Sequence, residues 1–459
     1  HKTQMTVVLN DNSLSISKSV GALSKYLTLI TTNKTYNKIR RKIWQISGII
    51  PLFSRFIRYF IKQTEKAIKG SLTPGSLFED LGLRYIGPID GHNLKDLIRA
   101  FKSVKEMNTP VLLHVYTKKG KRISVSDSDS IKYYSLAGSK KIKNDNLPAD
   151  YSKVFGQSLK KFSKDYNDLV CITAAMELGT GLNIFSSKYP DKYIDVGIAE
   201  EHAVTYAAGL AAAGKKPLVV LYSTFFQRAY DQVFHDVLLQ KLPVIFCLDR
   251  SGLVGEDGAT HHGVLDISYL RCIQNIIVTA PKDGNELRDL IFTATKNKNT
   301  PFTIRYPKEE CINFENQDAK IIEIGSWDVE KNGDDVLVLA VGSMVKRASE
   351  AANLLVNQGV SCEVVNCRFI KPMDENFLKN AFNKFDRVVT IEEGVVDGGF
   401  GEGVIAWAKK FNLKNSIINI GIPGEFIDHG PRNILLKEVG LDSSSLAEKI
   451  INFMRKPNE

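Results

Sequence analysis

Short apolar runs alternate with helical patterns through the middle of the chain. From about residue 150 onward, five strand-like runs are apolar and partly β-branched, and the segments between them include 200–214 and 224–240, where apolar residues recur at helical spacing. The five runs are CITAAM, YIDVGIA, KPLVVLYS, LPVIFCLD and IIVTAP. This alternation predicts a parallel sheet covered by helices on both faces.

The same alternation occurs on either side of this central part. MTVVLN and VLLHVYT are strand-like runs near the start, and DVLVLAVGS, SCEVVNCRFI, RVVTIEEG and SIINIGI belong to a third βα series. A Ser/Asp/Lys-rich stretch after residue 117 and the segment RYPKEECINFENQDAK read as linkers. We therefore expect an α/β protein of three domains with mostly parallel sheets covered by helices, with boundaries at 1–149, 150–315 and 316–459.

Composition and charge exclude several classes of protein. A chain of 459 residues that is 43% hydrophobic and 24% charged is neither disordered nor a small disulfide scaffold. No apolar run reaches the roughly 18 residues that a membrane span needs. Most of the net charge of +10 comes from 34–69, a segment that contains ten basic residues and a single acidic residue, Glu65. We expect a basic amphipathic helix there and no nucleic-acid-binding face elsewhere.

The first candidate site is the run Asn10-Asp11-Asn12, which follows a strand predicted to end at Leu9. Its side-chain oxygens would stand at a strand end, where a hard cation such as Mg²⁺ could bind. The alternative is an ordinary turn or helix cap, because Asn and Asp favour both.

The second candidate is the pair Glu200 and Glu201, which opens a segment of small apolar residues. That setting predicts that one of the two carboxylates is partly buried at a helix start. Burial favours the protonated form of a carboxyl group, which suits proton exchange with a nitrogen heterocycle. The alternative is an acidic first turn that the helix dipole favours.

The third candidate is a group of polar residues at two neighbouring strand ends and in the glycine-rich loop that follows. Arginines beside strand ends suit a phosphate or carboxylate, and a loop histidine can donate a hydrogen bond or transfer a proton. The group comprises Tyr222, Arg228, Arg250, Asp257, His261 and His262.

Taken together, these segments resemble the 1-deoxy-D-xylulose-5-phosphate synthases of the transketolase superfamily. The matching stretches include LNDNSLSISKSVGALS, PGSLFEDLGLRYIGPIDGHN, DVGIAEEHAVTYAAGLA, YSTFFQRAYDQVFHDV, LDRSGLVGEDGATHHG and FIDHGPR, in unchanged order from residue 9 to 431. The resemblance implies a transketolase-like, thiamine-diphosphate-binding architecture. The first domain would bind diphosphate, the second the pyrimidine ring, and the third would be the transketolase-type C-terminal domain.

The resemblance also implies an activity. The family condenses pyruvate with glyceraldehyde 3-phosphate to 1-deoxy-D-xylulose 5-phosphate and CO₂, at the start of non-mevalonate isoprenoid synthesis and of thiamine and pyridoxal precursor supply. It uses thiamine diphosphate and Mg²⁺ and acts as a homodimer. The expected compartment is the cytoplasm of a bacterium or, in a eukaryote, the plastid stroma.

The site residues that the resemblance implies can be assigned position by position. Glu200 and His261 would be catalytic, with Glu200 hydrogen-bonded to the aminopyrimidine ring. The cofactor-binding residues would be Asn12, Lys119, Ile123, Glu200 and Phe225, and Asn12 and the backbone carbonyl of Leu14 would ligate Mg²⁺. The substrate-binding residues would be Tyr222, Arg228, Arg250, Asp257 and Lys308.

The chain departs from the family pattern in four places. The family's GDG metal motif is not found in the chain, which begins with His1, so we expect an upstream portion of the first domain to be missing and the 459 residues alone to be inactive. Arg122 and Ile123 replace a Gly and a Tyr, Tyr134 replaces a pocket His, and Lys308 replaces an Arg of RYPRG. The alternatives are therefore a non-catalytic paralogue that has lost cofactor binding, or another transketolase-like enzyme.

Overall fold

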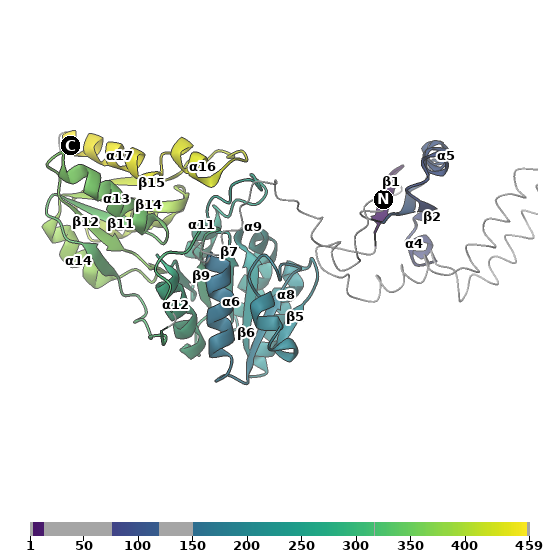
Figure 1. Cartoon of the computed structure of the whole chain (residues 1–459), viewed down its shortest axis with the longest axis horizontal. Helices are drawn as coiled ribbons and strands as arrows, with labels where there is room; N and C mark the ends of the chain where they lie inside the picture. Colours follow the sequence, from purple (N-terminus) through teal and green to yellow (C-terminus); the bar gives the residue numbers. More distant parts are fainter. Residues whose placement is uncertain (1–2, 13–75, 119–149, 316, 457–459) are drawn as a thin grey trace, which may run out of the picture. The chain divides into compact units, whose positions relative to one another are not determined.

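The computed structural model describes residues 3–12, 76–118, 150–315 and 317–456 (Figure 1). The chain divides into two compact units, His1–Ile142 and Lys143–Glu459, each with hydrophobic core of its own. The basic segment 34–69 lies outside the described residues, and so do Leu14, Lys119, Arg122, Ile123 and Tyr134. None of the described helices combines the length and apolar character needed to cross a membrane.

The first unit contains a three-stranded parallel sheet in the order β1-β3-β2. Its elements are β1 (Thr6–Asp11), α4 (Ser76–Asp80), β2 (Arg84–Asp90), α5 (Leu94–Lys105) and β3 (Val111–Tyr116). The central strand β3 packs apolar side chains against Ala100 and Val104 of α5. Strand β1 does not end at Leu9 as predicted, because Asn10 and Asp11 continue the ladder with β3. Only Asn12 of the Asn-Asp-Asn run therefore follows the strand.

The second unit begins with a seven-stranded sheet in the order β13-β8-β9-β7-β6-β4-β5, in which all neighbours except β13 and β8 are parallel. Six of its strands are β4 (Leu169–Thr173), β5 (Tyr193–Asp195), β6 (Lys216–Tyr222), β7 (Ile245–Asp249), β8 (Ile277–Thr279) and β9 (Phe302–Arg305). The five predicted runs form β4 to β8, so the parallel sheet expected from the sequence is confirmed.

Helices connect and cover these strands. They are α6 (Tyr151–Phe162), α7 (Asn183–Ser186), η2 (Pro190–Lys192), α8 (Glu200–Ala212), α11 (Asp266–Cys272) and α12 (Gly284–Lys296). The segment predicted to be helical over 224–240 is helical, but it is divided into α9 (Ser223–Phe226), η3 (Gln227–Ala229), α10 (Tyr230–Gln232) and the π-helix η4 (Val233–Leu238). The buried positions Phe226, Ala229, Val233 and Val237 still recur at helical spacing. An apolar period does not reveal which carbonyl each N–H contacts.

A second sheet, in the order β10-β12-β11-β14-β15, completes the unit and is parallel except between β10 and β12. Its strands are β10 (Asp328–Lys331), β11 (Val336–Ala340), β12 (Cys362–Asn366), β14 (Arg387–Val395) and β15 (Ser416–Ile422). Its helices are α13 (Met344–Val356), α14 (Glu375–Lys384), α15 (Phe400–Lys410), α16 (Arg432–Glu438) and α17 (Ser443–Arg455). Figure 1 shows this green-to-yellow part beside the teal part that holds the seven-stranded sheet.

The two sheets of the second unit share one stretch of chain. SCEVVNCRFI, predicted as one strand, divides into β12 and β13 (Phe369–Lys371), and β13 pairs antiparallel with β8 at the edge of the seven-stranded sheet. The prediction of one strand was wrong because both pieces are buried, so the apolar pattern carries no sign of the change of sheet.

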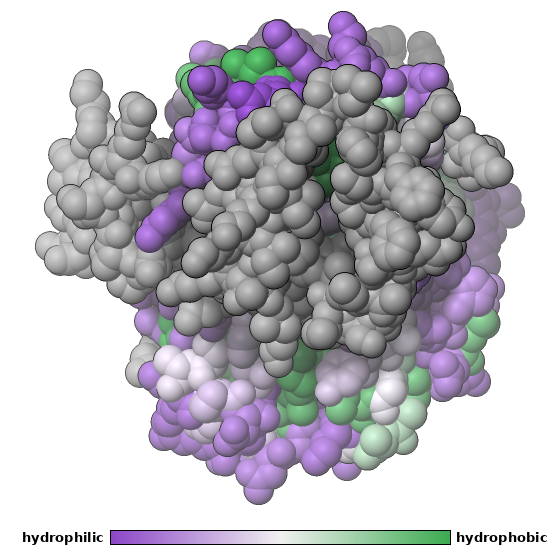
Figure 2. All heavy atoms as spheres, turned by 90° about the vertical axis from the view of Figure 1, so that its right-hand side faces the viewer, coloured by the Kyte–Doolittle hydropathy of each residue, from purple (hydrophilic) through white to green (hydrophobic). Residues whose placement is uncertain are grey.

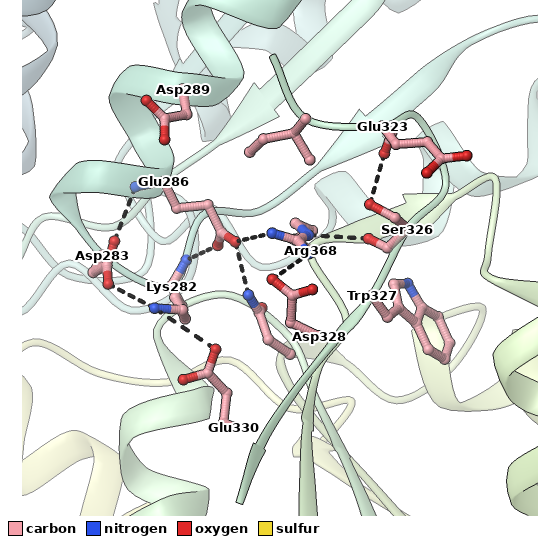
Figure 3. Close-up of polar contacts among 12 residues, drawn as sticks. Lys282, Asp283, Glu286, Asp289, Glu323, Ser326, Trp327, Asp328, Glu330 and Arg368 are labelled. Carbon is pink, nitrogen blue, oxygen red and sulfur yellow. Dashed lines mark hydrogen bonds and ion pairs between the residues drawn. The ribbon is translucent and has the colours of Figure 1, made fainter. Parts of the chain in front are cut away.

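Buried charges lie where the chain passes between these sheets (Figure 3). Arg368, between β12 and β13, pairs with Glu286 in the first turn of α12 at 3.2 Å, and its guanidinium also pairs with Asp328 and donates to the carbonyl of Ser326. Removing one member would leave a buried charge unpaired, so substitution of Arg368 or Glu286 should destabilise the fold.

Candidate active site

The polar residues singled out in the second unit lie at the carboxyl ends of parallel strands. Strand β6 ends at Tyr222, β7 ends at Asp249, and α8 begins at Glu200 shortly after β5. Because the strands run parallel, these ends lie at one edge of the sheet, where open α/β sheets bind ligands.

Glu200 is the buried carboxylate of the Glu200 and Glu201 pair. It is the first residue of α8 and its side chain is 2% exposed, whereas Glu201 is exposed. One carboxylate oxygen, Oε1, accepts a hydrogen bond from Nη1 of Arg228 at 3.0 Å. The predicted buried carboxylate at a helix start is thus present.

Aromatic side chains lie close to the arginine that binds this carboxylate. The ring of Phe225, on α9, stacks on Tyr222 at 5.8 Å between centroids and meets the edge of His261 at 5.3 Å. The guanidinium of Arg228 lies 5.1 Å from the centre of the Phe225 ring. A planar ring and a buried carboxylate therefore share Arg228 as a neighbour, an arrangement that fits a flat heterocycle with a protonatable nitrogen.

Arg250 has a left-handed backbone, with φ of 62°, directly after β7. Its Nη1 donates to the carbonyl of Gly179 at 2.6 Å and to Oδ1 of Asp249 at 2.9 Å. Its guanidinium lies 3.8 Å from the centre of the Tyr222 ring. Burial raises the pKa of Tyr222 to about 12, so this hydroxyl remains a hydrogen-bond donor beside a fixed cation.

Asp249 is a functional candidate that the sequence reasoning missed. It is fully buried, and its Oδ2 accepts from Oγ of Ser152 at 2.7 Å. Burial raises the pKa of Asp249 to about 6, although Arg250 and Ser152 act in the opposite direction. Its position immediately before Arg250 at a strand end was the available signal.

The remaining candidates lie in the loop after β7, except Lys308, which follows β9. Nζ of Lys308 donates to Oδ2 of Asp257 at 2.6 Å. Burial would raise the pKa of Asp257, but the Lys308 ammonium holds it below its usual range. Nδ1 of His261 shares a hydrogen bond with Thr260 at 2.9 Å. His262, in contrast, accepts from the N–H of Val254 and contacts the carbonyl of Asp428, so it links loops.

The predicted metal-ligating run is described only in part. Oδ2 of Asp11 lies 3.2 Å from Nε2 of His114, and Oδ1 of Asn10 accepts from Thr117. Asn12, the first residue after β1, has an amide oxygen of the kind that Mg²⁺ prefers. Within the described ranges, no three His, Cys, Asp or Glu residues group as a metal site. Leu14, Lys119 and Ile123 lie outside those ranges.

Three consecutive family profiles match the sequence. Residues 1–117 match the family described as 1-deoxy-D-xylulose-5-phosphate synthase, residues 148–312 match the transketolase pyrimidine-binding domain, and residues 325–446 match the transketolase C-terminal domain.

Curated relatives match nearly the whole chain. The sequence is 45% identical over 448 residues to 1-deoxy-D-xylulose-5-phosphate synthase of Aquifex aeolicus, a match that covers 97% of this chain and 71% of the relative. The proteins of the same name from Halothermothrix orenii and Caldanaerobacter subterraneus are 43% and 42% identical. Those matches cover 98% of this chain in both cases, and 72% and 73% of the two relatives.

Among solved structures, one match is a protein titled as a split-gene transketolase in an inactive β4 tetramer. The TM-score is 0.61 at 25% sequence identity, and the match covers 66% of this chain and 98% of that one. The transketolase-like α/β architecture expected from the sequence is therefore confirmed.

Proposed function

The chain belongs to the 1-deoxy-D-xylulose-5-phosphate synthase family, and from this premise we propose how its residues serve the family's reaction. The enzyme is a transketolase-type transferase that condenses pyruvate with glyceraldehyde 3-phosphate, releases CO₂ and forms 1-deoxy-D-xylulose 5-phosphate. This is the first step of non-mevalonate isoprenoid synthesis, and the product also feeds thiamine and pyridoxal synthesis.

The cofactors are thiamine diphosphate and Mg²⁺. Thiamine diphosphate supplies the carbanion chemistry that decarboxylation of a 2-oxo acid requires. In our proposal, Glu200 exchanges a proton with the aminopyrimidine ring and Phe225 stacks on that ring. Their fit to the ring is supported by the burial of Glu200 and by the aromatic side chains around Phe225.

The diphosphate and metal would be held by residues of the first unit. We propose that Asn12 and the carbonyl of Leu14 ligate Mg²⁺, that Lys119 faces the phosphates and that Ile123 contacts the cofactor. Amide and carbonyl oxygens suit a hard cation, and an ammonium suits a phosphate as a point charge.

The phosphorylated aldehyde would bind at the ends of β6 and β7. Tyr222, Arg250 and Lys308 provide a hydroxyl and two cations for its phosphate, with Arg228 beside them. Asp257 and His261 would line the pocket, and His261 would transfer a proton to or from the aldehyde oxygen. Support comes from the guanidinium of Arg250, which is fixed by two acceptors and one ring.

The three domains would be 1–149, 150–315 and 316–459, which agrees with three sheets and three family profiles. We also propose the cytoplasm as the compartment, since the relatives named above come from bacteria.

A homodimer is the proposed assembly. The described surface visible in Figure 2 is mainly hydrophilic, with apolar side chains gathered in places. The helices α8, α10 and η4 pack against one another, and large exposed apolar side chains on them and directly after η4 would lie in the dimer contact: Tyr206, Tyr230, Phe234 and Leu239. The split-gene transketolase chain, by its title, also associates with copies of itself.

The single observation that carries this assignment is the arrangement of a buried Glu200, Phe225 and Arg250 at one sheet edge in a chain 45% identical to a named synthase. A donor assay tests it. The enzyme expressed from its complete gene is given glyceraldehyde 3-phosphate with either pyruvate or a ketose phosphate as donor. We expect turnover with pyruvate alone. Use of the ketose donor would indicate a transketolase, and no turnover with either would favour the non-catalytic paralogue.

A further inference from the structure

The loop that carries Asp257 and His261 contacts the third domain at several points, and Leu253 makes two of these hydrogen bonds. Its N–H donates to Oε1 of Glu393 on β14 at 2.9 Å, and its carbonyl accepts from Nε of Arg432 at 2.8 Å. The same two side chains pair with each other, since Nη2 of Arg432 lies 2.7 and 2.6 Å from the two oxygens of Glu393. The ion pair of Arg432 and Glu393 therefore binds both the backbone N–H and the carbonyl of Leu253.

This ion pair is buried and has further partners. Glu393 is 2% exposed and its Oε2 also accepts from Oγ of Ser343 at 2.9 Å. The approach of the loop is close: a Cβ on Gly252, whose φ is +79°, would lie 2.4 Å from the carboxyl carbon of Glu393. The loop can reach this carboxylate only with glycine at that position.

Arg432 also holds the segment that carries Lys308. Its Nη1 lies 3.0 Å from Oε2 of Glu309, whose other oxygen accepts from Arg347 at 2.6 Å. Although burial raises the pKa of Glu309, these two guanidinium groups hold it below its usual range. In the family motif RYPRG a glycine stands at the position of Glu309. Arg432 of this chain therefore has a second carboxylate partner, Glu309, in addition to Glu393.

We propose that Arg432 and Glu393 are positioning residues for the aldehyde pocket: through Leu253 and Glu309 they hold the two segments that bear Asp257, His261 and Lys308 in register. The proposal rests on the substrate-pocket roles proposed above. Lys308 and Asp257, which pair at 2.6 Å, come from these two separate segments, so their contact depends on the common anchor. A lysine at 432 would keep the charge but not the planar fork that serves Leu253, Glu393 and Glu309 together.

Glycerol 3-phosphate, an unreactive probe with the phosphate and carbon chain of the aldehyde substrate, tests this by calorimetric titration of the whole chain. We expect Arg432→Lys to raise its Kd by about tenfold, the order of effect of a misplaced binding group. Arg368→Lys is the matched control, because Arg368 also bridges the two sheets (Figure 3). Its side chain is 10% exposed, against 12% for Arg432. The control should bind the probe like wild type.

The possible outcomes distinguish the positioning role of Arg432 from the proposed phosphate subsite on which it rests. An unchanged Kd in Arg432→Lys, or an equal loss in both variants, overturns the positioning role. Absence of probe binding by the wild type overturns the phosphate subsite, and the inference with it. Should Arg432→Lys not fold, Glu393→Gln, which keeps the shape of the side chain, decides in its place.

A kinetic readout distinguishes positioning from general loss of structure. In the active enzyme, Arg432→Lys should raise KM for glyceraldehyde 3-phosphate about tenfold and leave KM for pyruvate unchanged. A parallel rise in both KM values would show a merely structural residue and would contradict the proposal.

Discussion

At the scale of single residues, two carboxylates buried at the same sheet edge have different surroundings. Glu200 accepts from one exposed guanidinium, while Asp249 is fully enclosed and held by Ser152 and Arg250. In our proposal Glu200 exchanges a proton with a ligand, whereas Asp249 orients the guanidinium of Arg250. The two positions call for different tests.

Substitution of Glu200 tests its proposed role in proton exchange. Glu200→Gln keeps the size of the side chain but cannot exchange a proton, so kcat should fall by roughly 10²- to 10⁴-fold. Initial rates of CO₂ release measure this, and circular dichroism during heating checks the fold. Glu201→Gln is the control, because that neighbour is exposed and should retain the wild-type rate. Equal losses in both variants would refute the assignment of Glu200.

The raised pKa of Asp249 predicts a pH dependence of stability. Its folded pKa of about 6 exceeds the ordinary 3.8, so the folded state binds this proton more tightly than the unfolded state. The stabilisation is fully present below about pH 4 and is lost as pH rises through 6, with a total of about 3 kcal/mol. Asp249→Asn should remove this dependence and raise the free energy of unfolding above pH 6.

Urea unfolding at pH 5 and pH 8 measures the effect. Asp165→Asn provides the comparison, since Asp165 is exposed and its substitution should leave the pH dependence as in wild type. If Asp249→Asn shows the wild-type difference between the two pH values, the carboxylate is not the source of it.

At the scale of elements, the turn after β4 approaches Tyr222 and Arg250 of the proposed phosphate subsite so closely that it has no room for a side chain at Gly179. A Cβ on Gly179 would lie 1.7 Å from Oη of Tyr222 and 3.1 Å from Nη2 of Arg250. Gly179→Ala should therefore displace both groups and raise KM for glyceraldehyde 3-phosphate about tenfold or more, as measured by steady-state kinetics.

Gly209→Ala on α8 is the control for that substitution. No atom lies within 4 Å of a Cβ there, so alanine should stabilise the helix by about 0.5–1 kcal/mol and leave KM unchanged. If Gly179→Ala behaves in the same way, the packing of Tyr222 and Arg250 against that turn has no part in substrate binding.

Elements with a strong local signal could be predicted from the sequence. The strands β4 to β8 are short apolar runs, and the small residues after Glu200 indicated a tightly packed helix with a buried carboxylate. The change of sheet between β12 and β13 and the broken helix after β6 could not be predicted, because burial is the same on both sides of each change. Periodicity reports burial, not hydrogen-bond partners.

Site residues with a local sequence signal could also be predicted, whereas contacts between distant parts of the chain could not. Tyr222, Arg250 and Asp257 followed strand ends or lay in a glycine-rich loop, where functional residues gather. Glu393 and Arg432 act on that loop from about 140 and 179 positions further along the chain, and no local pattern marks such a contact.

At the scale of the whole molecule, the net charge of +10 comes mainly from one segment of the chain. Its largest concentration is at 34–69, outside the described residues, and the described cations of the site each have a specific neighbour. Arg228 meets Glu200, Arg250 meets Asp249 and Lys308 meets Asp257. Such paired cations suit a phosphorylated substrate of defined shape.

The proposed homodimer predicts the mass in solution. Sedimentation equilibrium should give twice the 51.2 kDa of one chain for these 459 residues. Leu239→Lys on the proposed contact should shift the mass toward the monomer, because a charge buried there would be unpaired. Leu354→Lys, at an exposed apolar position of α13, should not. A monomeric wild type, or a dimer unaffected by Leu239→Lys, would contradict this surface.

The synthase assignment itself is tested most directly by following the fate of the pyruvate carbons. The protein expressed from its complete gene is mixed with carbon-13-labelled pyruvate, glyceraldehyde 3-phosphate, thiamine diphosphate and Mg²⁺, and the products are identified by NMR. With pyruvate labelled at all three carbons, we predict two labelled carbons in 1-deoxy-D-xylulose 5-phosphate for each labelled CO₂, and Glu200→Gln should slow the formation of both by roughly 10²- to 10⁴-fold. Pyruvate that remains unchanged, while the cofactor binds, would contradict the account.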